Sequence, residues 1–400
     1  MKLTHTLFLI RTTNSFGWSA AMPFFAVYLE VERGVGLGII GAAYLVSGIL
    51  SLSGQLLGGW LTDILGSKRV MLAGYVSSIV SSVLMSYMLG TKFSVLPIIL
   101  VYVVFSFFRA LSNPATSALI ASQRSRSTIT SGFSLQTMGG NIGFGLGPAV
   151  GGIISEHLGY PFVFILSAAS ACTALTLALG LIKFNEFPND GVRTRIGSLR
   201  LRAFLPVGMG VLSFLGVVVV LYFVDGALYT PLSLYSAGFI HLSNQDIGLL
   251  FTTNGLLIVA LQIPLIKLFE RVGRINHAPA LAAILMAAAY VVIANTRSFE
   301  AYVIAMGVAT VGEILLTVPT QLIITSLSSP DNRGAYQGYY SAATSAGRTL
   351  ASFITPITFE LLFPPSNAWL AVCAVSLAGG LAYLVVLGKI SKKGFYTEKI

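Results

Sequence analysis

The sequence predicts an all-α integral membrane protein whose twelve transmembrane helices form two pseudo-symmetric six-helix halves. Composition is the first observation: 55% of the 400 residues are hydrophobic and only 10% are charged. The mean hydropathy is +0.83, which is unlike that of soluble proteins. The second observation is that apolar runs of about twenty residues, enough for a helix to cross the hydrocarbon core, recur along the whole chain. The third is that short motifs of the first half recur in the second.

The predicted spans follow one another with short polar breaks. The first contains Arg11, Asn14 and Pro23 and is longer than the apolar core of a signal peptide, so we expect it to be permanent. In the first half the spans are 6–29, 36–62, 69–90, 96–120, 130–156 and 160–182. In the second half they are 204–236, 245–269, 277–295, 299–326, 335–362 and 368–388.

The distribution of basic residues predicts the orientation of these spans. Most of the 24 Lys and Arg residues, such as Lys68 and Arg69, fall at the ends of the chain or in the loops on one side. The other side holds Arg33, Lys92 and Arg297. Because short basic loops stay cytoplasmic, we expect both termini inside the cell and a multi-pass protein of the plasma or inner membrane. This asymmetry accounts for the net charge of +10 without a nucleic-acid partner.

Two pairs of motifs indicate an internal repeat. The segment "DILGSKR" at 63–69, after span two, is echoed by "ERVGR" at 270–274, after span eight. In spans four and ten, "SNPATSALI" at 112–120 corresponds to "TVPTQLIIT" at 317–325. Many secondary transporters consist of two such halves around a midplane site. We therefore expect a six-helix bundle at 1–183, a cytoplasmic linker at 184–203, and a second bundle with a short tail at 204–400.

The loop at 59–70 carries a family resemblance. It resembles the signature between spans two and three of the major facilitator superfamily, with Gly59, Leu61, Asp63, Gly66, Lys68 and Arg69 in place. The resemblance implies the fold of that superfamily and a latch that closes the cytoplasmic side in the outward-open state. Asp63 sits at a helix end where the dipole disfavours a negative charge, so it needs a partner, for which Arg124, Arg126 and the start of span eleven are the candidates. The alternative is a solvated turn that only fixes the topology.

Span five combines a glycine repeat with a proline. Glycines at 139, 143, 147 and 151 are four residues apart, so they share one helical face on which another helix can approach closely. Pro148 should bend the helix. Gly143, Gly147, Pro148, Gly151 and Gly152 also resemble the span-five signature of the twelve-span drug:proton antiporters, which favours export over import. The alternative is a packing device alone.

Five charged residues fall inside the predicted spans: Arg11, Arg109, Asp225, Glu313 and Arg348. Each costs roughly 2.5–3.5 kcal/mol on insertion scales, so such residues are usually functional, although Arg11 is near enough to a helix end to reach the surface. We hypothesise that Glu313 and Asp225 exchange protons and help to bind a cationic substrate, while Arg109 and Arg348 tune them. The alternatives are a fixed ion pair of Glu313 with Arg109 or Arg348, and a position of Asp225 near the outer surface.

Polar and aromatic side chains within the spans are candidates for substrate contact. An aromatic lining suits amphipathic or cationic ligands, although polar side chains also join membrane helices to one another. The predicted substrate-binding residues are Asn14, Gln136, Gln262, Tyr229, Tyr336 and Tyr340, with Asn141, Asn254 and Gln321 as further polar candidates.

The sequence gives no support for an enzyme. It has no glycine-rich phosphate-binding loop, its four His residues are scattered, and Cys172 and Cys373 lie in different spans. We expect no cofactor and no metal, and we expect the proton gradient to supply the energy. The expected partners are a small-molecule substrate, protons and membrane lipids, with the protein acting as a monomer.

These observations predict a secondary active transporter that exports lipophilic or cationic compounds in exchange for protons by alternating access, as multidrug efflux proteins do. One alternative is a proton-linked importer of a sugar or organic anion, in which Arg109 or Arg348 would bind the substrate. Another is a lipid-moving or receptor-like protein on the same fold.

Overall fold

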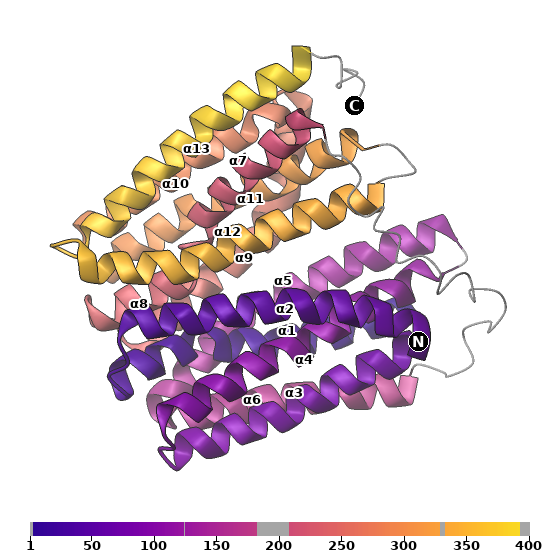
Figure 1. Ribbon diagram of the computed structural model, residues 1–400, viewed down its shortest axis with the longest axis vertical. Coiled ribbons are helices and arrows are strands. Elements are labelled where there is room, and N and C mark those ends of the chain that lie inside the picture. Colours follow the sequence, from indigo (N-terminus) through magenta and orange to yellow (C-terminus); the bar gives the residue numbers. More distant parts are fainter. Residues whose placement is uncertain (1–2, 124, 182–207, 329–332, 393–400) are drawn as a thin grey trace.

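The protein is a bundle of long helices arranged in two halves (Figure 1). The computed structural model describes residues 3–123, 125–181, 208–328 and 333–392, and these residues contain helices and no strand. The first half comprises α1 (Leu3–Val27) with the short π-helix η1 (Tyr28–Glu32), α2 (Leu37–Leu65), α3 (Ser67–Gly90), α4 (Val95–Ala121), α5 (Arg126–His157) and α6 (Tyr160–Leu181). The second comprises α7 (Met209–Gly226), α8 (Thr230–Gly238), α9 (Asn244–Arg271), η3 (Ile275–His277), α10 (Ala278–Asn295), α11 (Phe299–Ser326), α12 (Arg333–Leu361) and α13 (Asn367–Lys392).

The twelve predicted spans are confirmed, with one correction. Span seven was expected to be one helix, but it is broken between Gly226 and Thr230 into α7 and α8. Pro231 lies in the first turn of α8, where its missing N–H would have no helical acceptor in any case. A proline inside a continuous helix would instead remove one hydrogen bond and clash with the preceding turn. The predicted linker at 184–203 lies outside the described residues.

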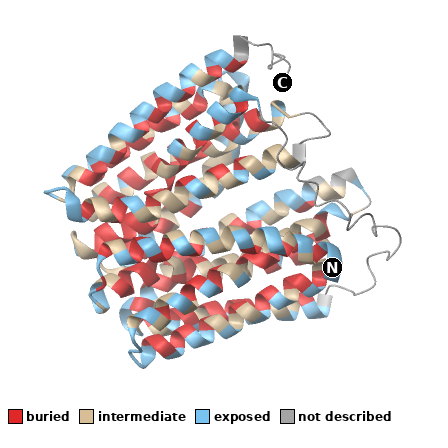
Figure 2. Cartoon of the chain, in the orientation of Figure 1, coloured by how far each residue is buried: buried red, intermediate tan, exposed pale blue. Residues whose placement is uncertain are grey.

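Both ends of the described chain lie on one side of the bundle, called here the termini side (Figure 1). On the other side, called here the distal side, buried side chains of both halves merge into one apolar cluster, with Phe25 and Tyr102 from the first half and Tyr235 and Trp369 from the second. The outward faces of the helices carry many exposed residues (Figure 2). They include large apolar side chains such as Leu381, as expected of a surface in contact with lipid.

Nine helical segments of the described residues are long and apolar enough to cross a membrane, with α7 and α8 counted together. The three long helices that fall short of this measure are α1, α5 and α12. All three contribute to the central cavity described below. A helix that lines a water-accessible cavity can carry polar residues on that face, which lowers its mean hydropathy without exposing polar groups to lipid.

The glycine face predicted on α5 is confirmed, and its partner is α1. A Cβ atom at Gly143 would stand 2.7 Å from the backbone nitrogen of Phe16, and one at Gly147 would stand 2.5 Å from the carbonyl oxygen of Phe16. Gly151 lies equally close to the backbone of Ala20. Absent side chains therefore let two helix backbones touch, a common way of joining membrane helices.

Glycines also join the two halves, on the distal part of the molecule. Gly145 of α5 meets Gly255 of α9, and a Cβ at Gly145 would lie 3.1 Å from the carbonyl carbon of Gly255. On the other side of the interface, Gly41 and Gly48 of α2 lie against Phe353 and Thr349 of α12. Beyond these contacts the halves separate toward the termini side (Figure 1). The protein is therefore closed on its distal side.

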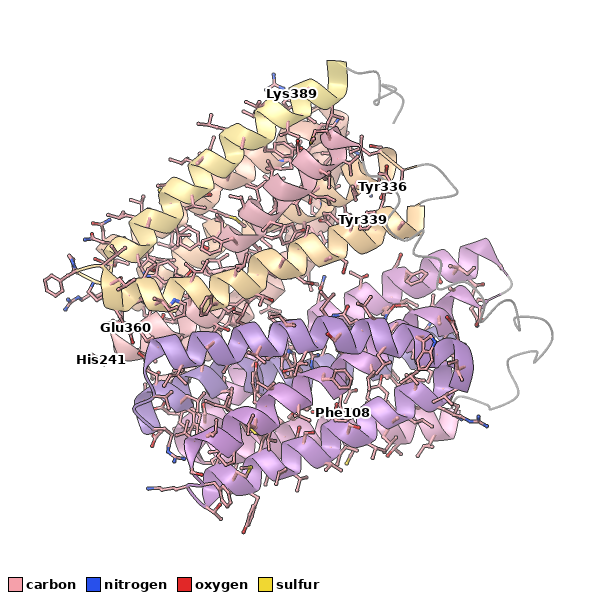
Figure 3. All side chains as sticks on the ribbon, viewed as in Figure 1. Phe108, His241, Tyr336, Tyr339, Glu360 and Lys389 are labelled. Carbon is pink, nitrogen blue, oxygen red and sulfur yellow. The ribbon has the colours of Figure 1, made fainter. Side chains whose placement is uncertain are left out.

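Two glutamates reinforce this closure by capping helices of the opposite half. Glu360, at the distal end of α12 (Figure 3), accepts a hydrogen bond from the backbone N–H of Leu37, the first residue of α2, at 2.9 Å. Glu156, near the end of α5, accepts one from the backbone N–H of Asn244, the first residue of α9, also at 2.9 Å. The first N–H groups of a helix have no partner within it, and the helix dipole favours a negative charge there. The two caps occupy corresponding positions in the two halves.

Gly147→Ala should destabilise the protein. The added methyl group has no room between α1 and α5, and overpacking of this kind costs about 1–3 kcal/mol. We expect a lower unfolding temperature in detergent, measured by scanning fluorimetry. The control is Gly216→Ala in α7, where an added Cβ would have no heavy atom within 4 Å. Equal unfolding temperatures for the two variants would contradict the packing argument.

Removal of each cap should loosen only the helix start that it contacts. Loss of a capping side chain costs about 1 kcal/mol, so local opening should become ~5-fold more frequent. In hydrogen–deuterium exchange, Glu360→Ala should speed exchange at the start of α2, and Glu156→Ala should speed it at the start of α9. Each variant serves as the control for the other. Unchanged exchange at both sites would show that the caps do not hold the interface.

Candidate functional site

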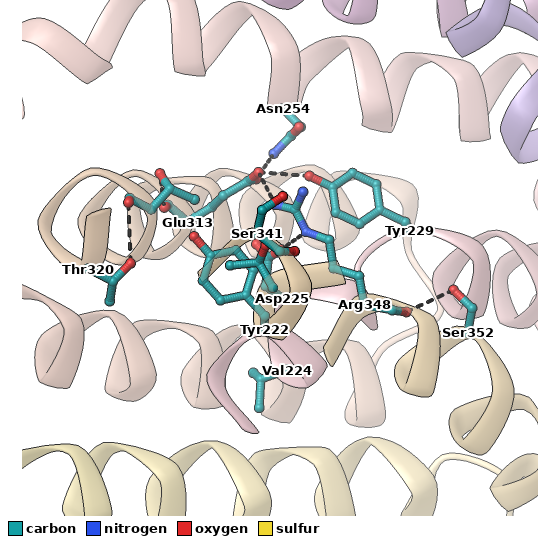
Figure 4. Close-up of polar contacts among 12 residues, drawn as sticks. Tyr222, Val224, Asp225, Tyr229, Asn254, Glu313, Thr320, Ser341, Arg348 and Ser352 are labelled. Atoms are coloured by element: carbon teal, nitrogen blue, oxygen red, sulfur yellow. Dashed lines mark hydrogen bonds and ion pairs between the residues drawn. The ribbon is translucent and has the colours of Figure 1, made fainter. Parts of the chain in front are cut away.

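Glu313 is the acid at the centre of the candidate site. It lies in α11 with only 7% of its side chain exposed. The hydroxyl of Tyr229 donates a hydrogen bond to Oε1 at 2.7 Å, and Nδ2 of Asn254 donates one to Oε2 at 2.9 Å (Figure 4). Arg348 Nη2 stands 3.8 Å from Oε1. The carboxylate is thus contacted by side chains of two other helices, α9 and α12, and of the segment between α7 and α8.

Asp225 is fully buried in the last turn of α7. The expected alternative placed it near the outer surface, but α8 continues span seven beyond it. Arg348 Nε lies 2.6 Å from its Oδ2, and the two form the closest ion pair among the described residues. A negative charge at a helix C-terminus is unfavourable, and the guanidinium offsets it. The other oxygen, Oδ1, is buried and has no hydrogen-bond partner.

Arg348 joins these two acids. Its backbone packs against α7, because a Cβ at Gly226 would stand 2.7 Å from Cα of Arg348. Its guanidinium lies 5.2 Å from the ring centre of Tyr222 and 5.6 Å from that of Tyr229, within the range of cation–π attraction. The side chain is 42% exposed, and this exposed part lines the central cavity. With both acids ionised, the three charged groups sum to a net charge of −1.

The central cavity has a volume of about 610 Å³, which is in the range of small-molecule sites. It lies between the halves, on the termini side of the contact between Gly145 and Gly255. From the first half, α1 contributes Arg11, Ser15, Trp18 and Met22, and α5 contributes Gln136, Thr137, Gly140, Asn141 and Phe144. The wall of the second half includes Tyr229, Gln262, Glu313, Thr317, Gln321 and Arg348.

The structure brings some of the predicted substrate-binding residues together and leaves others out. Gln136, Gln262 and Tyr229 line the cavity. Asn14, Tyr336 and Tyr340 are not among the residues that line it. The hydroxyl of Tyr340 is instead engaged with the hydroxyls of Tyr222 and Thr320, at 2.7 and 2.8 Å. Tyr336 lies near Tyr339 on the part of α12 toward the termini side (Figure 3).

Arg109 does not join the acid cluster. Its guanidinium lies 3.8 Å from the ring centre of Trp18, and its buried Nε has no hydrogen-bond partner. The expected alternative of a pair between Arg109 and Glu313 is therefore excluded in this conformation, since the described ion pairs of Glu313 and Asp225 are both with Arg348. The contact with Trp18 orients Arg109 within the first half.

In the loop of the predicted latch, Asp63 has no ion pair with a described residue. Gly66 ends α2 with a positive φ of 86°, a conformation that favours glycine. Asp63 and Arg69 are exposed, whereas Lys68 is buried. Gly59 has no heavy atom within 4 Å of an added Cβ, and Arg124 lies outside the described residues. The latch therefore remains a prediction for the conformation in which the termini side is closed.

Sequence reasoning missed part of the α1 wall. Ser15 and Trp18 were not singled out, yet both line the cavity together with Arg11 and Met22. These four positions follow the spacing i, i+4, i+7 and i+11, which places them on one face of a helix. That spacing, anchored on Arg11, was the available signal. Phe144 of α5 was also missed, eight residues after Gln136 on the same face.

Comparison with known proteins agrees with this architecture. The sequence model of the Major Facilitator Superfamily matches residues 7–223 and 214–395. The MFS-type transporter YttB of Bacillus subtilis, itself uncharacterized, is 23% identical over 363 residues, which cover 86% of this chain and 84% of that protein. The quinolone resistance protein NorA of Staphylococcus aureus is 26% identical over 250 residues, 62% of each chain.

Solved structures of the same fold include the peptide transporter POT in complex with sulfate. Its TM-score is 0.77 at 15% identity, with 97% of this chain and 95% of that one covered. The nucleoside transporter NupG gives a TM-score of 0.76 at 17% identity, with 96% and 99% covered. These likenesses show the fold, and the sequence match spans both halves. The chain belongs to the major facilitator superfamily and is a multi-pass transporter of the cell membrane, not an enzyme.

Proposed function

We propose that this transporter exports lipophilic or cationic compounds in exchange for protons by alternating access. The observation that carries the proposal is the position of Glu313. Its carboxylate lines the central cavity and is also joined through Arg348 to the buried Asp225. A substrate in the cavity and a proton can therefore act on the same group.

The charge of the cluster makes the two ligands compete. Glu313, Asp225 and Arg348 carry a net charge of −1 when both acids are ionised, and either a proton or a cationic substrate neutralises it. A buried uncompensated charge is costly, so the cluster favours one of the two ligands at a time. If conversion between open states is easier with the cluster neutral, protons and substrate must move in opposite directions. This is the exchange that an antiporter needs.

The hydrogen bonds from Tyr229 and Asn254 favour the ionised form of Glu313. Tyr229 belongs to the segment between α7 and α8, and it packs against Phe144 of the first half and Phe251 of α9. Movement of the halves would therefore change the contacts of the residue that donates to the acid. This links proton affinity at Glu313 to the conformation of the protein.

Two observations bear on the proposed direction of transport, which is export from the cytoplasm. They are the orientation of the chain in the membrane and its similarity to NorA. The basic loops favour a cytoplasmic termini side, so this conformation is the one open to the cytoplasm. Asp63 would then engage its partner when that side closes. NorA, a relative named for quinolone resistance, agrees with export of drug-like compounds.

Glu313→Gln should abolish proton-driven transport while the protein still folds. In proteoliposomes with an acidic interior, the wild type should accumulate the cationic dye ethidium, because protons leave as dye enters. The variant cannot exchange a proton, and uptake should fall by on the order of tenfold or more, corresponding to ~1.4 kcal/mol or more. The control is Glu300→Gln, an exposed acid in the first turn of the same helix.

The same vesicles test the importer alternative. A proton-linked importer would take up a sugar or an organic anion when the exterior is acidic, and it would leave the dye outside. That result would contradict the proposed function. Transport of ethidium by Glu313→Gln at the wild-type rate would exclude Glu313 as the proton carrier.

Asp63→Asn should reduce transport without loss of stability. Asp63 is exposed here, so its removal costs this conformation little, whereas the closed termini side loses a charge–dipole contact of up to ~2 kcal/mol. We expect dye uptake to fall with an unchanged unfolding temperature. Full activity of the variant would exclude the latch and leave the topological role of this loop.

A further inference from the structure

The first half contributes positive charge to the cavity without an acid to balance it. Arg11 of α1 lines the cavity, and its Nη1 donates a hydrogen bond at 3.3 Å to the neutral side chain of Asn113. Arg109, whose guanidinium lies 3.8 Å from the ring centre of Trp18, adds a second positive charge to the same half. Among the described residues, the ion pairs of the cavity region all involve Arg348 and lie within the second half. Arg11 and Arg109 therefore have no carboxylate at ion-pair distance in the described parts of the chain.

The second half has the opposite imbalance, with two acids and one base in the cluster of Asp225, Glu313 and Arg348. The cavity thus has one cationic wall and one anionic wall, contributed by different halves. Charges in the membrane interior are costly unless a counter-charge offsets them. A single ligand that spans the cavity can supply both counter-charges.

Arg11 is placed to reach such a ligand. Where α5 passes its guanidinium, the helix presents Gly140, and a Cβ there would stand 3.2 Å from Nε of Arg11. The carbonyl oxygen of Gly140 accepts a hydrogen bond from Ser15 at 2.8 Å, so it is already engaged. An arginine has five N–H donors, and Asn113 takes one of them. The remaining donors can form a fork for a carboxylate or phosphate group.

We propose that the cavity binds amphoteric substrates, with an anionic group at Arg11 and a cationic group at Glu313. This inference rests on the proposed function and specifies its substrate class. A purely cationic compound would leave Arg11 without a counter-charge, and a purely anionic one would leave the acid cluster without one. An amphoteric compound would also join the two halves, because its anionic group contacts α1 of the first half and its cationic group contacts α11 of the second.

Equilibrium binding in detergent, without any gradient, tests this substrate class separately from proton coupling. The probes are a quinolone that carries a carboxylate and a piperazinium group, and the methyl ester of the same compound, which keeps only the cation. Isothermal titration calorimetry should give tighter binding of the amphoteric quinolone to the wild type. Arg11→Gln should weaken its binding by about 10- to 100-fold, the loss expected for hydrogen bonds to a charged group, and should leave the ester unchanged.

Two further variants make the test specific. Arg11→Lys keeps the charge but loses the planar fork, so its affinity for the amphoteric quinolone should lie between those of wild type and Arg11→Gln. Arg297→Gln, an exposed arginine between α10 and α11, should bind both compounds as the wild type does. Replacement of chloride by gluconate in the buffer tests whether an inorganic anion binds at Arg11. If it does, the affinity for the ester would depend on chloride, and the acid would bind no more tightly than the ester.

The outcomes separate the two proposals. Equal affinities for acid and ester, or equal losses for both in Arg11→Gln, would overturn the anionic subsite and leave proton-driven export standing. A preference for the acid that depends on Arg11, without proton-driven uptake in vesicles, would support the subsite and overturn the exchange mechanism. Failure of both compounds to bind would exclude this substrate class.

Discussion

The ion pairs of Arg348 with two carboxylates fix the arrangement of three helices in the second half. Asp225 comes from the end of α7, Glu313 from the middle of α11, and the guanidinium from α12. Removal of one partner from a buried pair leaves an unbalanced charge, which costs several kcal/mol. These helices must therefore keep their register at this level of the membrane. The close approach of α7 and α12 at Gly226 and the helix break that follows it are the local conditions that allow this geometry.

The two halves pack closely on the distal side, whereas on the termini side they diverge around a polar cavity. On the distal side, glycines bring helix backbones of the two halves together, as at Gly145 and Gly255, and an apolar cluster common to both halves fills the space between them. Toward the termini side the same helices diverge and present polar side chains to the cavity. The glycine contacts involve only backbone and small residues, whereas separation of the halves on this side would also divide the apolar cluster. Alternation of the open side therefore has to offset the exposure of that apolar surface.

Much of the fold was predictable from the sequence, whereas the exact composition of the site was not. Apolar runs located the spans, and a spacing of four identified the glycine face of α5. Glu313 could be assigned to the site because it is an acidic residue inside a membrane span. The rotation of each helix about its axis decides which polar residue faces inward, so Asn14 was expected in the cavity whereas Ser15 and Trp18 line it. The preference of Arg348 for Asp225 over Glu313 likewise depends on the relative register of three helices, which no local pattern contains.

The two glutamate caps on the distal side should leave little covariation between the positions that they join. In each cap a glutamate meets a peptide N–H, at Leu37 in one case and at Asn244 in the other. Every residue type except proline supplies that donor, so the partner position is free to vary while the contact persists. Correlated substitutions between the two positions should therefore be weak in any set of aligned relatives. The only trace left by each cap would be a retained acid at the end of a helix, and contact inference from covariation would overlook both.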